Sequence, residues 1–158
     1  SGLAGRGGTM GPRTGMTTVA GVPAADLIPA DRTGTIVQGA RGGGAEIVNL
    51  LKTGSAFYAP SAAVAQMIDA IVLDTRQVLP CTVHLEGEYG IHGLFTGVPC
   101  RLGEGGLVEV VDVALTDDER VALHRSAGAV HDVVKVMDAR RDEIDPGLGS
   151  MTDGIRIG

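Results

Sequence analysis

The chain has 158 residues, of which 44% are hydrophobic and 20% are charged, a balance typical of one globular domain with its own core. Its net charge of -6 argues against a nucleic-acid partner, because nucleic acids favour a basic surface. No apolar run approaches the roughly 18 residues of a membrane span, and no signal peptide is visible. We therefore expect a cytoplasmic protein without a membrane partner.

The pattern of residues 3–21 predicts short extended segments separated by glycine turns. Four glycines lie between residues 5 and 11, and glycine lets a backbone approach a ligand closely. This segment is either a ligand-binding loop or a flexible N-terminal arm, and composition alone does not decide between them. Residues 23–29 then predict a single helical turn that ends at Pro29.

Two longer helices are predicted next. Asp31 or Thr33 is a candidate N-cap for the first, which three consecutive glycines at 42–44 interrupt. Each glycine costs a helix interior about 1 kcal/mol, so we expect a kink or two separate helices there. The second helix is predicted to start at Pro60 and run to about residue 77, with Met67 in its buried stripe.

Three strands are predicted at residues 78–86, 94–102 and 107–115, and their short connections favour an antiparallel meander. Thr116 and Glu119 form a capping-box pattern that starts a helix running to about residue 140. We expect one domain over residues 1–140. Residues 141–158 are charged and glycine-rich, and we expect them to be a disordered tail.

Two cysteines, Cys81 and Cys100, fall in the predicted strands. Their spacing fits no metal motif, so no metal site is expected. We interpret them as buried thiols, although a disulfide stays possible if their strands are neighbours. His124 and His131 are seven residues apart, too far for one metal ion, and are interpreted as surface or partly buried residues.

Several phrases of the sequence agree in order and spacing with one known family. They are LAGRGGTMGP at 3–12, TTVAGVP at 17–23, GGGAEIVNLLKT at 42–53, GSAFYAP at 54–60 and GVPC at 97–100. Over roughly residues 3–138 the chain resembles the C-terminal substrate domain of the lactate/malate dehydrogenase family. The resemblance implies an α+β fold, with long helices packed on a twisted antiparallel sheet. It also implies a homo-oligomer, since such proteins commonly form dimers or tetramers.

The same resemblance exposes two unusual substitutions. Arg6 stands where the family has its histidine base, and Gly8 stands where it has an aspartate. A general base must exchange a proton near neutral pH, whereas the arginine pKa lies above about 12. The family's dinucleotide motif is also not found after a predicted strand; residues 39–44 are only a glycine cluster within a helical pattern. We therefore expect no cofactor and no hydride transfer by this chain alone.

A small-molecule site around the altered loop is the corresponding hypothesis. Arg6 is the candidate catalytic residue, because a guanidinium offers a planar fork of donors to a carboxylate or enolate oxygen. Gly54 lies where the family has a substrate-selecting residue, and its missing side chain leaves room for a bulky substrate. The other candidate substrate-binding residues are Thr9, Met10, Thr17, Thr18 and Ser55. Asp26, Glu46 and Tyr58 are available as a replacement acid or base but remain unplaced.

The sequence is compatible with three functions. The favoured one is a repurposed non-redox enzyme, an isomerase, cyclase or lyase, with secondary-metabolite biosynthesis as a setting. The second is a ligand-binding or regulatory pseudoenzyme that covers its open face by self-association. The third is a fragment or split half of a malate/lactate dehydrogenase-type oxidoreductase. The first is favoured over the third because a mere fragment would retain the histidine and the aspartate.

Overall fold

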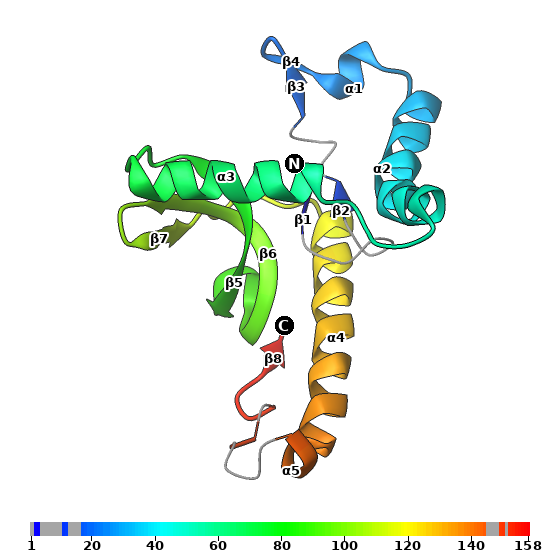
Figure 1. The fold of residues 1–158 in the computed structure, drawn as a ribbon. Helices are drawn as coiled ribbons and strands as arrows, with labels where there is room; N and C mark the ends of the chain where they lie inside the picture. The colour runs from blue at the N-terminus through cyan, green and yellow to red at the C-terminus, as the bar shows by residue number, and fades with distance from the viewer. Residues whose placement is uncertain (1, 4–10, 13–16, 145–148, 151) are drawn as a thin grey trace.

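The computed structural model describes residues 2–3, 11–12, 17–144, 149–150 and 152–158 (Figure 1). Two short antiparallel pairs come first. Strand β1 (Gly2–Leu3) pairs with β2 (Gly11–Pro12), and β3 (Thr18–Val19) pairs with β4 (Val22–Pro23). These strands agree with the short extended pieces predicted from the sequence. One helical turn follows as predicted, α1 (Ala24–Leu27).

Helix α2 (Ala30–Leu51) is one continuous helix of 22 residues, so the predicted interruption at residues 42–44 is wrong. Glycine makes a helix less stable but leaves its backbone hydrogen bonds available, so three glycines need not break it. The predicted N-cap is also wrong. Pro29 occupies that position without a side-chain cap, and the Thr33 hydroxyl instead donates to the Pro29 carbonyl at 3.3 Å.

Helix α3 (Tyr58–Val72) begins two residues before Pro60 and ends before the predicted residue 77. Its end is set by a turn in which Asp74 and Arg76 have φ values of 46° and 56°. Residues with such left-handed backbones cannot continue a right-handed helix. Met67 is partly buried against the core cluster, as predicted.

The main sheet has the order β5-β6-β7 and is antiparallel. Its strands are β5 (Val78–Glu86), β6 (Ile91–Gly103) and β7 (Gly106–Val110), and a 3-10 turn, η2 (Glu88–Gly90), joins β5 to β6. The bounds of β5 are those predicted. Strand β7 ends five residues before the predicted residue 115. The backbone carbonyl of Val111 and the N–H of Val113, which follow the strand, are hydrogen-bonded to the Tyr89 hydroxyl and not to a neighbouring strand.

Helix α4 (Asp117–Ala139) starts at the predicted capping box, in which Thr116 and Glu119 each satisfy a backbone N–H of the other. Helices α3 and α4 share one core with the inward side of β5 and β6. Alternation along these strands buries every second residue, as expected for a sheet with one covered face. The core cluster consists of Ala70, Leu79, Cys81, Leu85, Ile91, Leu94, Val98, Cys100, Leu102, Leu123 and Ala127. The predicted α+β class, long helices on an antiparallel sheet, is confirmed.

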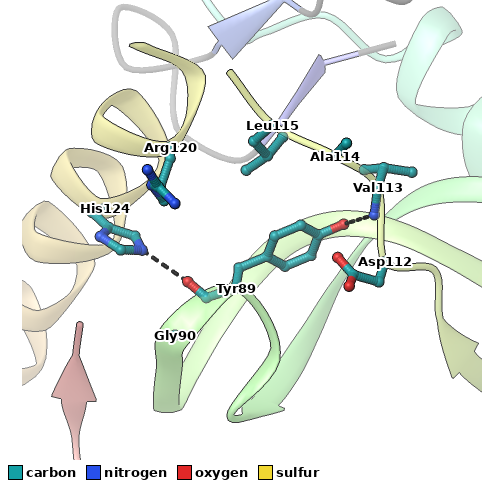
Figure 2. A pocket seen from close by; sticks show the side chains of 8 residues that line it. All are labelled: Tyr89, Gly90, Asp112, Val113, Ala114, Leu115, Arg120 and His124. Carbon is teal, nitrogen blue, oxygen red and sulfur yellow. Dashed lines mark hydrogen bonds between the residues drawn. The ribbon is translucent and has the colours of Figure 1, made fainter. Parts of the chain in front are cut away.

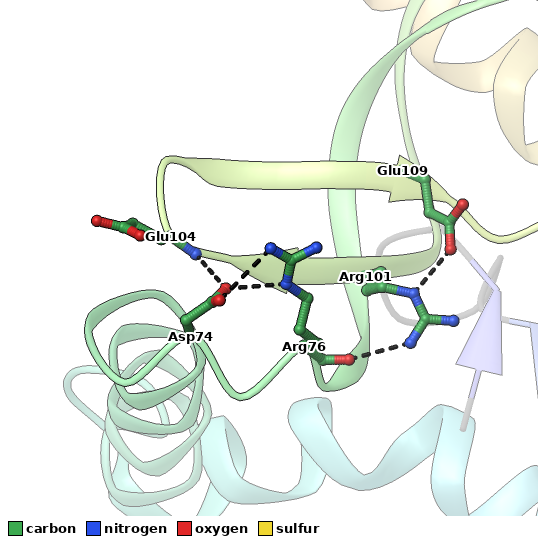
Figure 3. A network of polar contacts seen from close by, with 5 residues as sticks. All are labelled: Asp74, Arg76, Arg101, Glu104 and Glu109. Carbon is green, nitrogen blue, oxygen red and sulfur yellow. Dashed lines mark hydrogen bonds and ion pairs between the residues drawn. The ribbon is translucent and has the colours of Figure 1, made fainter.

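A polar network ties the turn after α3 to the β6–β7 hairpin (Figure 3). The Asp74 carboxylate accepts from Arg76 Nε at 3.0 Å and from the backbone N–H of Glu104 at 2.8 Å. Arg101 donates to Glu109 Oε1 at 2.7 Å and to the Arg76 carbonyl at 3.1 Å. The donors around Asp74 hold the pKa of its carboxyl below its ordinary value, the Glu104 N–H contributing most.

The last part of the chain forms α5 (Arg141–Ile144) and a final strand, β8 (Arg156–Ile157). Strand β8 pairs with the first two residues of β6. The domain boundary at 140 and the disordered tail over residues 141–158 both stay predictions; α5 and β8 are the elements that the structure describes in this range. Within the described residues, no helix is both long and apolar enough to cross a bilayer.

Candidate functional site

Three of the predicted site residues, Arg6, Thr9 and Met10, lie outside the described residues. Their roles stay predictions from the sequence. The strands on either side of this segment, β1 and β2, pair with each other. The described residues that flank Arg6 in the sequence, Leu3 and Gly11, therefore lie opposite each other.

The other predicted residues are described and lie in two places. Thr17 and Thr18 are exposed at β3, and the Thr17 carbonyl accepts from the N–H of Ala24 at 2.7 Å. Gly54 and Ser55 are exposed in the turn between α2 and α3. Figure 1 shows β3 toward the start of α2 and this turn at its end. The structure therefore does not bring the two pairs together, and their substrate contacts stay predictions.

Gly54 has a φ of +94°, a backbone conformation that favours glycine. Among the described residues, its chain neighbours apart, no atom lies within 4 Å of the place where a Cβ would sit. Its role in leaving room for a substrate stays a prediction. The three unplaced acid or base candidates, Asp26, Glu46 and Tyr58, are all exposed, on α1, α2 and α3 respectively. Their role as acid or base stays a prediction.

One pocket of about 370 Å³ lies between η2, the segment after β7 and the start of α4 (Figure 2). Its walls combine aliphatic side chains with the ring of Tyr89 and two cationic or titratable side chains, Arg120 and His124. The remaining lining residues are Gly90, Asp112, Val113, Ala114 and Leu115. Sequence reasoning did not identify this pocket.

Three polar side chains of this pocket have hydrogen-bond or ion-pair partners. The Tyr89 hydroxyl donates to the Val111 carbonyl at 2.7 Å and accepts from the Val113 N–H at 3.3 Å. His124 Nε2 lies 2.8 Å from the Tyr89 carbonyl, which can only accept, so Nε2 carries the hydrogen. Arg120 pairs with Asp117 on its own helix. The bonds of Tyr89 make this place a junction between η2, the segment after β7 and α4.

The sequence carried a partial signal for this junction. The capping box at Thr116 fixes where α4 starts, and therefore places Arg120 and His124 one turn apart on the same face. Nothing in the sequence pairs that face with Tyr89, because 35 residues separate Tyr89 from His124. The contact is a product of the sheet topology.

The two cysteines are free and buried, as predicted. Burial raises the pKa of the Cys81 thiol, and burial together with the neighbouring Cys81 raises the pKa of Cys100 to about 11. The Cys100 thiol donates to the Val98 carbonyl at 3.3 Å. A protonated, buried thiol is a poor nucleophile, so this pair belongs to the core. Among the described residues, no three or more His, Cys, Asp or Glu side chains gather into a metal-binding group.

Comparison with known proteins gives a consistent result. A family model described as the lactate/malate dehydrogenase alpha/beta C-terminal domain matches residues 5–139. The malate dehydrogenase of Thermomicrobium roseum is 56% identical over 135 residues, which span 85% of this chain and 43% of that protein. The malate dehydrogenase of Roseiflexus sp. is 47% identical over 137 residues, 87% of this chain and 44% of that protein.

Solved structures agree. Malate dehydrogenase from Salinibacter ruber matches with a TM-score of 0.86 and 45% identity, over 91% of this chain and 47% of that one. Lactate dehydrogenase from Cryptosporidium parvum matches with a TM-score of 0.80 and 33% identity, over 87% of this chain and 47% of that one.

These matches overturn the function favoured from the sequence. A repurposed non-redox isomerase, cyclase or lyase in biosynthesis is wrong, because the relatives are dehydrogenases at up to 56% identity. The fragment or split-half alternative fits better. The error came from giving two substitutions, Arg6 and Gly8, more weight than the similarity of the rest of the domain.

Proposed function

The chain belongs to the lactate/malate dehydrogenase family, as its alpha/beta C-terminal domain, and on that premise we propose that it is the substrate-domain portion of a malate dehydrogenase-type oxidoreductase. The observation that carries this proposal is the 56% identity over 135 residues to the Thermomicrobium roseum protein. The chain spans less than half the length of the relatives it matches, 43% for that protein. The activity of the whole protein is therefore part of the proposal.

The nicotinamide dinucleotide that this activity requires does not fit the glycine cluster of this chain. Residues 39–44 lie in the interior of α2. A pyrophosphate is held by free N–H groups at the start of a helix, whereas interior N–H groups are bonded to carbonyls of the same helix. We assign the dinucleotide to a separate nucleotide-binding segment and derive no step of the reaction through it.

The role left for the described domain is to bind and orient a small hydroxy acid. By its resemblance to the family, position 6 faces the substrate, and the guanidinium of Arg6 suits a carboxylate group. The same guanidinium cannot accept the hydroxyl proton. General-base catalysis contributes about 10²- to 10⁴-fold to a reaction rate, so we propose that substrate binding is retained while turnover falls by that order.

The exposed face of α2 supports association with a partner. No residue of α2 is buried, yet Ile36 and Leu50 are 57% and 74% exposed, and Ile47, Val48 and Leu51 are exposed as well. Large apolar surfaces of this kind mark contact sites rather than free surface. We propose that a second copy of the protein covers α2, so that the assembled form is a homo-oligomer.

A hybrid protein tests the function. The nucleotide-binding half of the Thermomicrobium roseum malate dehydrogenase is joined to this chain in two forms, unchanged and with Arg6→His plus Gly8→Asp. The intact relative is the positive control. We expect the double variant to oxidise malate with NAD, and the unchanged hybrid to be slower by about 10²- to 10⁴-fold.

Malate binding distinguishes a failure of the proposed function from a failure of the role given to position 6. Calorimetric titration should give similar malate affinity for both hybrids in the presence of NADH. A double variant that binds NADH and is folded but neither binds nor oxidises malate would refute the proposed function. Equal turnover by both hybrids would refute the role given to position 6.

A further inference from the structure

The first half of β6 has an edge that β7 does not cover. Strand β7 pairs only with residues 100–103 of β6, at the far end of that strand. The edge at Ile91 and His92 is instead paired with β8. An open strand edge can pair with a strand of another chain. The segment that covers this edge of β6 therefore determines whether such pairing can occur here.

The segment that covers it is made of Ser150 and residues 152–158, called here the C-terminal strap. It lies after residue 139, where the match to the family ends. Figure 1 shows it rising beside α4 and ending next to β6. The family comparison therefore assigns it no role.

A hydroxyl pair anchors the start of the strap to the last turn of α4. Ser150 and Thr152 both donate to Asp138 Oδ2, at 3.2 and 3.0 Å. The N–H of Thr152 donates to the Ser150 hydroxyl at 3.3 Å. Hydrogen bonds to a charged acceptor are stronger than neutral ones, so this carboxylate holds the start of the strap against the helix.

The end of the strap is held by backbone pairing and by apolar packing. Ile157 lies opposite Ile91, and the N–H of Gly158 donates to the Gly90 carbonyl at 2.8 Å. Ile155 and Ile157 are partly buried against the core cluster, whereas Arg156 between them is exposed. This alternation is that of a strand with one covered face.

Strand β6 allows the backbone of the strap to approach closely at Gly93. Gly93 has a φ of +74°, and a Cβ built on it would lie 3.3 Å from the Gly154 carbonyl oxygen. Any larger residue at position 93 would press on the strap. Such close approach of two backbones is a common reason for a glycine in a strand.

From these contacts we infer that the edge of β6 at residues 91–93, with Asp138 of α4, is a strand-accepting edge whose built-in ligand is the C-terminal strap. Its ligand class is an extended peptide that ends in the pattern Ile-x-Ile-Gly and carries two hydroxyl residues, three and five positions before the first isoleucine. When the strap is released, this edge accepts the same peptide supplied in trans. This inference does not depend on the proposed dehydrogenase function.

The test uses the full chain and a labelled peptide with the sequence of residues 150–158. In the variant Ile155→Asp plus Ile157→Asp the strap loses its apolar contacts. We expect the peptide to bind this variant saturably, and to bind the unchanged chain at least ten-fold more weakly because the strap already occupies the edge. The control Arg156→Ala changes an exposed residue and should behave like the unchanged chain.

Amide exchange provides a second measurement that needs no binding in trans. The Gly158 N–H should be protected in the unchanged chain and in Arg156→Ala, and should exchange at least ten-fold faster in the double variant and in Asp138→Ala. Circular dichroism checks that each variant is folded. Unprotected Gly158 in the unchanged chain, or no peptide binding by a folded double variant, would overturn the inference.

Discussion

Replacing Tyr89 by Phe removes one oxygen that joins η2 to the segment after β7. That hydroxyl makes two hydrogen bonds, to the Val111 carbonyl at 2.7 Å and from the Val113 N–H at 3.3 Å. A neutral hydrogen bond contributes about 0.5–1.5 kcal/mol net, and Tyr89 is only partly buried, so we expect a total loss of about 1–2 kcal/mol in the free energy of unfolding. For a chain of this size that corresponds to a melting temperature lower by about 2–8 °C.

Urea denaturation followed by circular dichroism measures the change, and amide exchange at Val113 locates it. The chain has only one other tyrosine, Tyr58, which is 82% exposed on α3. Tyr58→Phe is therefore a matched control that should leave the unfolding midpoint unchanged. If the two variants unfold at the same urea concentration, or if Val113 exchanges at its original rate in Tyr89→Phe, the junction described here is not held by that hydroxyl.

Three further predictions concern other parts of the domain. Gly43→Ala should stabilise α2 by about 1 kcal/mol and slow exchange of its amides, because alanine is the better helix former. The added Cβ meets no atom within 4 Å among the described residues outside the backbone of its own helix turn. Faster exchange would indicate a bend at the glycines. Because the pKa of Asp74 is lowered in the folded state, its ionised carboxylate stabilises the fold above pH 3.8, the ordinary value of the group. This stabilisation is lost as pH falls through the lower pKa of the folded state. Melting temperature should thus fall more steeply on acidification in the unchanged protein than in Asp74→Asn, and parallel curves would contradict the network in Figure 3. Because the thiol pKa values of Cys81 and Cys100 are raised, the latter to about 11, their contribution to stability is present below the ordinary value of 9.0 and lost as pH rises toward 11. A thiol reagent at neutral pH should label them only in urea, so prompt labelling of the folded protein would count against their burial.

Local signals in the sequence predicted the elements that local interactions determine. The bounds of β5 follow from alternation over nine residues, and the start of α4 follows from a capping box that spans only Thr116 to Glu119. The end of β7 was missed because the group that ends it, the Tyr89 hydroxyl, comes from a segment 22 residues earlier. The strap was missed for the same reason, since its partners on β6 and α4 are distant in sequence.

The interruption predicted for α2 shows a different limit. A propensity describes an average cost of about 1 kcal/mol per glycine and does not state whether the helix on each side continues. Here residues on both sides of 42–44 are helical, and the chain accepts the cost. The prediction of a non-redox enzyme failed for a similar reason. It rested on two substitutions in one loop, whereas the remaining sequence follows the pattern of the family.

The uneven burial of the two halves of the domain has a consequence for its synthesis. All residues of the core cluster lie between Ala70 and Ala127, whereas α2 contributes none. Chains emerge from the ribosome N-terminus first, so α2 is exposed to the cell before the sheet exists and stays exposed after the sheet has formed. Until the proposed second copy covers them, its aliphatic side chains stay in water, and exposed apolar side chains favour aggregation of a nascent chain.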